Sequence, residues 1–412
     1  MNTGDTAWVL VSSSLVMLMT PAIGLFYGGM VDRKNLLSTI MLSFATLLFV
    51  TIQWVLVGYS LAFGPDVGHC IGALSWCGLA ALSSVSSYAP TIPHMAYMLF
   101  QMKFAIITPA LITGAFIERV RFSAFMLFTL LWTTIVYDPI AHWVWGEGGW
   151  LRALGSLDFA GGTVVHITAG VAALAVCIAL RHRARAVDGR FVPVSVPLTL
   201  FGAVLVWFGW FGFNGGSALG ANGLAAQALV TTNLAAAAAA LTWMLLSRSE
   251  RGPSAVGTAT GAVVGLVAIT PACGYVDAFS SLLIGAIGSV VSYTSIKLAG
   301  RLHIQDSLDV CACHGMAGTW GALATGIFAS KAINPAGVDG LIYGNWHLLW
   351  AQIIAVVAVW SFTFVVTYAL AKIVDRLVHF TVTERQQRLG LDIYHYGPEL
   401  PESAIATNGT LV

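Results

Sequence analysis

Two histidines lie in apolar stretches of this 412-residue chain, and each opens the same short string. His166 is followed by Ile-Thr-Ala-Gly170 and His314 by Gly-Met-Ala-Gly318, so both strings read His-x-x-Ala-Gly. An ionisable side chain at the bilayer centre costs at least about 2.5 kcal/mol, so such residues usually face a cavity on a substrate or proton path. Two neutral imidazoles can share a proton, because each offers one donor and one acceptor nitrogen. The alternative is two separate histidines bonded to helix carbonyls, but the repeated context favours a paired site in a pore.

The elements that must position these histidines are membrane helices. Hydrophobic residues make up 58% of the chain and charged residues 9%, which excludes an ordinary soluble protein of this length. The mean hydropathy of +0.82 agrees. Apolar runs long enough to cross a hydrocarbon core, about 20 residues, predict an all-α membrane protein of eleven transmembrane helices, near residues 6–30, 37–63, 92–117, 122–141, 158–180, 197–215, 223–247, 254–271, 277–299, 308–328 and 346–373.

The basic residues predict the orientation of these helices, because short cytoplasmic loops are enriched in Lys and Arg. With the N terminus outside, all 19 basic residues except Arg152, Lys331 and Lys103 fall on the cytoplasmic side. An odd number of helices then places the C terminus inside. The N-terminal stretch lacks the basic start of a secretory signal, so we interpret it as a retained first helix. We therefore expect a multi-pass protein of the cell membrane, with a membrane domain at 1–375 and a cytoplasmic tail at 376–412.

The two halves of the chain contain matching strings. The first predicted helix ends in Phe26-Tyr-Gly-Gly29 and the sixth contains Phe213-Asn-Gly-Gly216, while the fifth and tenth carry the histidines. Repeats of five helices must have opposite topology, which is the inverted-repeat plan with a site near the membrane midplane. The eleventh helix is then an appendage.

Several longer strings, in this order along the chain, resemble the Amt branch of the Amt/Rh family of ammonium transporters. They are Gly24 to Asn35, Gln53-Trp54 with Gly58 to Gly64, Asp158 to His166, Trp210 to Ser217, Thr270 to Tyr275, and His314-Gly315. The resemblance covers about residues 6 to 375. It implies a homotrimer of eleven-helix subunits in the lipid bilayer, each with a narrow hydrophobic pore for ammonium and ammonia. The Rh branch fits less well, because its additional N-terminal helix has no counterpart here.

The resemblance also implies a role for individual residues. The roles are ammonium recruitment at the outer mouth for Trp145, Ser217, Phe100 and Asp158, a phenylalanine gate for Phe104 and Phe213, and the paired pore histidines for His166 and His314.

Each of these residue types also has a structural interpretation. A tryptophan near a helix end is often an interfacial aromatic, and phenylalanines in helices usually pack. Asp158 opens the fifth helix, so it can be the N-cap that satisfies free backbone amides. Asp309, which follows the cytoplasmic loop at the start of the tenth helix, is expected to be the cap of that helix.

Two charged residues depart from the family's usual pattern. Lys103 precedes the gate phenylalanine, and Asp138 lies near the end of the fourth helix. The third and fourth helices turn near Val120, with these residues at almost equal distances from the turn, so they should lie at the same depth and form an ion pair. The pair is either an additional ammonium-binding or switch site or a static link between two helices.

The tail departs from the family as well. The family's Gly-x-Asp followed by His-Gly-Glu is interrupted here, reading Gly390-Leu-Asp392 and then His395-Tyr-Gly-Pro-Glu399. This leaves open whether the partner is a PII-type regulator or a signalling module following Ile405–Val412. We expect a transporter that deprotonates ammonium and passes ammonia with a relayed proton, or alternatively an ammonium receptor with little or no flux. Neither is an enzyme, and no cofactor, metal or nucleic acid is expected.

Overall fold

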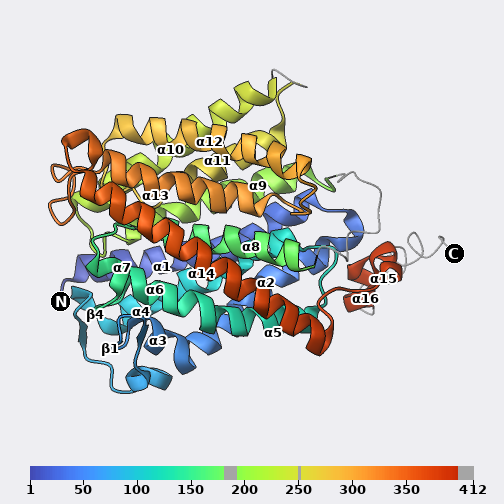
Figure 1. The fold of residues 1–412 in the computed structure, drawn as a ribbon, viewed down its shortest axis with the longest axis horizontal. Coiled ribbons are helices and arrows are strands. Elements are labelled where there is room, and N and C mark those ends of the chain that lie inside the picture. Colours follow the sequence, from blue (N-terminus) through green and yellow to red (C-terminus); the bar gives the residue numbers. More distant parts are fainter. Residues whose placement is uncertain (181–192, 249–251, 398–412) are drawn as a thin grey trace.

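The structure, a computed structural model, describes residues 1–180, 193–248 and 252–397. Long helices run side by side through the whole molecule (Figure 1). The elements are α1 Thr3–Met30, η1 Arg33–Asn35, α2 Leu36–Gln53, η2 Trp54–Gly58, α3 Tyr59–Phe63, β1 Asp66–Val67, β2 Ile71–Gly72, η3 Leu74–Leu79, β3 Val85–Ser86, β4 Ala89–Pro93, α4 His94–Ile112, η4 Thr113–Ala115, α5 Phe122–Trp132, η5 Thr133–Tyr137, α6 Asp138–Trp145, α7 Trp150–Ala153, η6 Gly162–Ile167, α8 Thr168–Ala179, α9 Val196–Trp210, η7 Phe211–Gly215, α10 Gly223–Arg248, α11 Ala255–Ile269, α12 Ala278–Arg301, η8 Cys311–Met316, α13 Ala317–Phe328, η9 Leu341–Tyr343, α14 Trp346–Val378, α15 Glu384–Leu389 and α16 Leu391–Tyr396.

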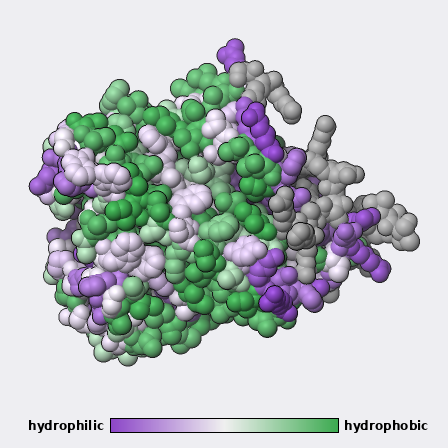
Figure 2. Space-filling view, in the orientation of Figure 1, coloured by the Kyte–Doolittle hydropathy of each residue, from purple (hydrophilic) through white to green (hydrophobic). Residues whose placement is uncertain are grey.

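The predicted all-α membrane fold is confirmed. Within the described residues, 9 helical segments are long and apolar enough to cross a membrane. On the face shown in Figure 2, hydrophobic residues predominate over the middle, and the most hydrophilic described residues lie towards the two ends. The predicted spans 254–271 and 308–328 are also helical, but α11 has 15 residues and α13 has 12 after the six-residue turn η8. The count of eleven spans therefore stays a prediction.

The two described ends of the chain lie at opposite ends of the bundle (Figure 1). The N terminus lies beside the antiparallel pairs β1–β2 and β3–β4, whereas α15 and α16 lie at the far end. Following the charge-based prediction, we call the end with the N terminus the outer end and the other the inner end. Five arginines used in that prediction lie outside the described residues, namely Arg181, Arg183, Arg185, Arg190 and Arg251, as do Glu399 and Ile405–Val412.

The two histidine-bearing segments have the same construction and cross at glycines. Each begins with a six-residue π-helix, η6 or η8, that continues into a 12-residue α-helix. A Cβ on Gly170 would lie 2.0 Å from the backbone nitrogen of Gly315, and a Cβ on Gly318 would lie 3.2 Å from that of Ile167. In both cases the glycine four residues after one histidine meets the residue directly after the other. This reciprocal contact is what an inverted repeat predicts for two antiparallel segments.

The start of α2 is capped by the C-terminal tail. The two carboxylate oxygens of Asp392 accept hydrogen bonds from the backbone nitrogens of Leu37 at 2.9 Å and Ser38 at 2.7 Å. These amides belong to the first turn of the helix, whose N–H groups have no partner within the helix. Gly390 has φ +101°, and a Cβ there would lie 2.6 Å from Cβ of Lys34. In the Gly-x-Asp string, Gly390 thus allows the close approach to Lys34, and the carboxylate of Asp392 caps α2.

We expect Asp392→Ala to release the tail. Loss of a capping side chain costs about 0.5–2 kcal/mol, which changes an equilibrium roughly 2- to 30-fold. Trypsin cleavage at Arg385 and Arg388 in the native protein should accelerate by about that factor. The matched control is Glu384→Ala, which removes only an exposed ion pair with Arg388 and should change the rate less than twofold. Equal rates for wild type and Asp392→Ala would show that the cap does not hold the tail.

Candidate functional site

Four buried aromatic rings form a continuous column inside the bundle. The ring centroids of Phe104 and Phe213 are 4.4 Å apart, those of Phe213 and His166 are 5.8 Å apart, and those of His166 and His314 are 5.4 Å apart. None of the four residues is more than 3% exposed. The structure therefore brings together the residues that the sequence analysis assigned to the gate and to the histidine pair.

Three of these rings are placed by π-helical turns. Phe213 lies in η7, His166 in η6 and His314 in η8, while Phe104 lies in the regular helix α4. Single π-turns inside α-helices are rare and occur frequently at functional sites. No sequence signal indicated these turns, because hydrophobic periodicity does not separate a π-turn from the α-helix around it.

The two histidines face each other through the same ring atom. The Nδ1 atoms of His166 and His314 are 3.3 Å apart, and the ring planes differ by 22°. One Nδ1 must donate and the other accept, so the rings hold complementary tautomers. Nε2 of His166 is buried and has no hydrogen-bond partner in residues 1–180, 193–248 and 252–397.

A cavity of about 450 Å³ lies at the outer end of the column. Its lining includes every residue predicted to recruit ammonium, together with the gate residue Phe104: Phe100, Phe104, Trp145, Asp158 and Ser217. The indole N–H of Trp145 donates to the carbonyl of Asp158 at 2.9 Å, and the Ser217 hydroxyl donates to the carbonyl of Phe213 at 2.8 Å. Both polar groups are thereby fixed at the cavity wall.

Asp158 acts as a helix cap beside this cavity. One carboxylate oxygen accepts from the backbone nitrogens of Gly161 and Gly162, and the other from those of Thr163 and Val164, at 2.7–3.1 Å. The structural interpretation of this residue is thus correct. Its negative charge still lies at the wall of the outer cavity.

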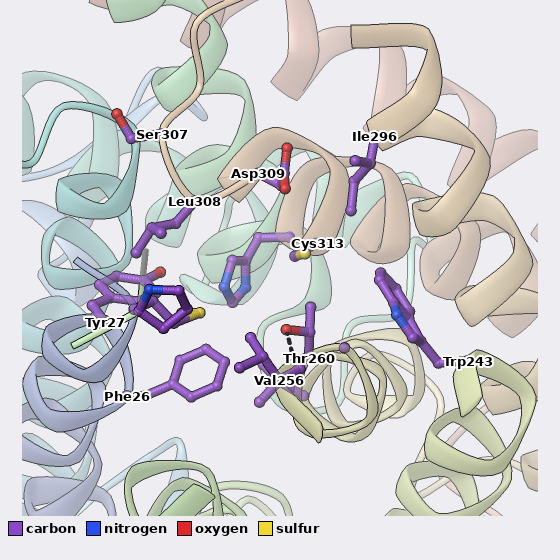
Figure 3. A pocket seen from close by; sticks show the side chains of 15 residues that line it. Phe26, Tyr27, Trp243, Val256, Thr260, Ile296, Ser307, Leu308, Asp309 and Cys313 are labelled. Atoms are coloured by element: carbon purple, nitrogen blue, oxygen red, sulfur yellow. Dashed lines mark hydrogen bonds between the residues drawn. The ribbon is translucent and has the colours of Figure 1, made fainter. Parts of the chain in front are cut away.

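A second cavity, of about 340 Å³, lies at the inner end of the column. His314 and Cys313 line it, together with Phe26, Tyr27 and Asp309 (Figure 3). The outer cavity reaches Phe104 and the inner cavity reaches His314. The ring column is therefore the closed segment between two cavities at opposite ends.

The expected cap of the second histidine helix was wrong. Asp306, not Asp309, accepts a side-chain hydrogen bond from the backbone of Cys311, at 2.7 Å. Asp309 has φ +56° and lines the inner cavity instead. Asp306 precedes His314 by eight residues, the same spacing as Asp158 to His166. That repeated spacing was the signal in the sequence that identifies the correct cap.

The predicted ion pair between Lys103 and Asp138 is also wrong. Asp138 is fully buried and accepts a hydrogen bond from Nε2 of Gln53 at 2.7 Å. Among the described residues no ion pair joins Asp138 to Lys103, whose amine lies 3.9 Å from the sulfur of Met102. Lys103 lies on the more exposed stripe of α4 with Met95 and Leu99. Equal depth in the bilayer does not make two side chains face each other, because each helix can be rotated about its axis.

Comparisons with known proteins agree with this architecture. The model of the Ammonium Transporter Family matches residues 7–399. An ammonium transporter of Bacillus subtilis is 48% identical over 401 residues, covering 96% of this chain and 98% of the relative. Ammonium transporter Amt1 of Archaeoglobus fulgidus is 46% identical, covering 95% and 98% of the two chains.

Solved structures give the same result. The crystal structure of Candida albicans Mep2 is 35% identical with a TM-score of 0.90, over 99% of this chain and 92% of that one. A structure titled Sensor Amt Protein is 28% identical with a TM-score of 0.87, covering 95% and 98%. The protein is therefore a multi-pass protein of the cell membrane and not a member of an enzyme family. With the matched family model and these relatives, the chain belongs to the ammonium transporter family.

Proposed function

We propose that this protein carries ammonium inward by binding NH4⁺ in the outer cavity, removing one proton, and passing NH3 along the ring column. His166 and His314 relay the released proton to the inner cavity. The observation that carries this proposal is the unbroken series of ring contacts between the two cavities.

The buried column can select ammonium over potassium by chemistry. The idealised cost of moving a small ion from water into a medium of low dielectric constant is of order 20 kcal/mol. The apolar side chains of the column offset little of this cost. Ammonium avoids the cost by losing a proton, and potassium has no proton to lose. Selectivity then follows from the apolar walls rather than from a size-matched hole.

The outer cavity suits the cation before this step. The faces of Trp145, Phe100 and Phe104 can each contribute roughly 0.5–2 kcal/mol of cation–π attraction, and the Ser217 oxygen can accept a hydrogen bond. Asp158 is engaged by four backbone amides. It therefore supports the cation through its charge and not as a direct ligand.

The proton balance follows from the facing Nδ1 atoms. NH4⁺ passes the Phe104–Phe213 gate and gives its proton to the unpartnered Nε2 of His166, whose Nδ1–H passes its own proton to Nδ1 of His314. The proton on Nε2 of His314 then leaves towards the inner cavity. This sequence needs the Nδ1–H tautomer of His166 and the Nε2–H tautomer of His314 at the start.

An ammonium pulse on liposomes containing the wild-type protein is expected to evoke an inward current, because proton and ammonia cross together. A potassium pulse of equal concentration should evoke none, and protein-free liposomes give the baseline.

The resemblance to the structure titled as a sensor favours a second candidate, an ammonium receptor. Saturable ammonium binding in calorimetry without any current or ammonia flux would establish that second function and overturn transport.

We also propose the domain boundaries of the chain and its oligomeric state. Residues 1–375 form the transport domain, and 376–412 form a cytoplasmic tail; the last long helix, α14, ends at Val378. The working unit is a homotrimer, and the tail is the place for a PII-type regulator or a fused signalling module to act.

A further inference from the structure

A buried acid and a buried amide join two membrane helices outside the ring column. Asp138 is 0% exposed and Gln53 is 6% exposed. Nε2 of Gln53 donates to Oδ2 of Asp138 at 2.7 Å and to the Thr134 hydroxyl oxygen at 3.0 Å, while that hydroxyl donates to the carbonyl of Leu130. Both amide hydrogens of Gln53 are thus in use.

The second oxygen of each group has no donor. In the described ranges, neither Oδ1 of Asp138 nor Oε1 of Gln53 has a hydrogen-bond partner, although both atoms are inaccessible to solvent. An ionised carboxylate and an amide oxygen can only accept, so these two atoms cannot satisfy each other. A buried, unpaired carboxylate charge is among the most costly groups in a protein interior.

A π-turn adjoins each residue of this pair. The π-turn η2 begins directly after Gln53, and the π-turn η5 ends directly before Asp138. The two turns lie against each other. Two facing π-turns indicate that this contact is a specific feature of the fold, since such turns are uncommon and concentrate at functional sites.

The space around the amide is small. A Cβ on Gly58 would lie 2.7 Å from Oε1 and 2.9 Å from Nε2 of Gln53. The glycine therefore lets the amide pack against its own helix. A metal or ammonium ion needs a shell of several oxygen ligands, whereas a proton needs no additional volume.

Three neighbouring titratable groups, Tyr59, His94 and His142, have hydrogen-bond partners other than Asp138. On α3 and α4, the Tyr59 hydroxyl and Nε2 of His94 are 2.6 Å apart. On α6, the ring nitrogens of His142 contact the carbonyl of Ala62 and the carboxylate of Asp66. Tyr137 adjoins the pair in sequence, and Lys103 on α4 makes no ion pair with Asp138 among the described residues.

We propose that Asp138 is a proton-binding site, and that the protonated acid forms a neutral acid–amide pair with Gln53 between the two π-turns. One proton on Oδ1 supplies the missing donor to Oε1 of Gln53, while Oδ2 continues to accept from Nε2. Both unpartnered atoms are satisfied and the buried charge is removed. The pair is therefore a neutral connection between α2 and α6 and not an ammonium site.

Infrared difference spectroscopy tests the protonation directly. The wild-type protein at neutral pH should show the carbonyl stretch of a protonated carboxylic acid, sensitive to deuterium exchange, and Asp138→Asn should lack it. The control Glu147→Gln makes the same chemical change at an exposed residue and should retain the band. A carboxylate band lost in Asp138→Asn, in place of the acid band, would overturn the proposal.

Substitutions separate a neutral pair from a cation site. The new amide in Asp138→Asn can donate to Oε1 of Gln53 and accept from Nε2, so the melting temperature should match wild type and the ammonium affinity should agree within about twofold. Gln53→Leu removes both bonds and should lower the melting temperature. Ammonium affinity reduced tenfold or more in folded Asp138→Asn would show an ionised cation site instead. If Gln53→Leu does not fold, Asp138→Asn still decides between the two.

Discussion

Alanine in place of either His166 or His314 is expected to reduce the ammonium-evoked current at least about a hundredfold, the range for loss of a positioned general acid or base. Either change breaks the contact between the two Nδ1 atoms, so the proton released by ammonium has no path to the inner cavity. The measurement is the current in liposomes containing equal amounts of each variant. Circular dichroism should show unchanged helix content, because removing either ring leaves the backbone hydrogen bonds of η6 and η8 in place.

The matched control for these variants is His347→Ala, an exposed histidine on α14, which should conduct like wild type. Unchanged current in both pore variants would reject the relay. Potassium current in either variant would show that the imidazoles also exclude dehydrated ions, since the enlarged space can then hold water.

Gly170→Ala is expected to have the largest effect on stability. Its Cβ would lie 2.0 Å from the nitrogen and 2.3 Å from Cα of Gly315. Both are backbone atoms, so the helices must separate. Overpacking of this kind costs about 1–3 kcal/mol and sometimes more, and the separation also disturbs the facing histidines. Melting temperature in detergent and ammonium current should both fall.

Alanine variants of two other glycines provide melting temperatures for comparison. In Gly315→Ala the nearest atom to the new Cβ would be 3.2 Å away, so a smaller loss is expected, and Gly223→Ala meets nothing within 4 Å. The order of melting temperatures, from highest to lowest, should be Gly223→Ala, then Gly315→Ala, then Gly170→Ala. A Gly170→Ala variant as stable as Gly223→Ala would mean that the two helices do not cross as closely as described.

The features that the sequence predicted are those that depend on one segment at a time. Apolar length identified the membrane helices, and a repeated string around His166 and His314 identified the pair, because equivalent positions in opposed repeats must meet near the axis. The outer-mouth residues, such as Trp145 and Ser217, were supplied by the family resemblance, since an isolated tryptophan or serine has no distinctive spacing.

The two wrong predictions have different causes, one between segments and one within a segment. Distance from the turn indicated the depth of Lys103 and Asp138 but not the rotation of α4 and α6, so the partner of Asp138, Gln53 on α2, was missed. The cap of the second histidine helix was missed because its first turn, η8, begins at Cys311, three residues later than the predicted span. Cavity volumes and π-turns depend on packing of the whole bundle, and no local pattern encodes them.

The reciprocal crossing of the two histidine helices has an electrical consequence. Each helix carries a dipole with its positive end at the N terminus, and α8 and α13 have equal lengths and run in opposite directions. Their fields along the pore axis therefore largely cancel, and each N terminus is capped by its own carboxylate, Asp158 or Asp306. A charge between the rings, such as the relayed proton, then experiences little net field from these two helices toward either side of the membrane. The direction of flow is left to the concentration and proton gradients.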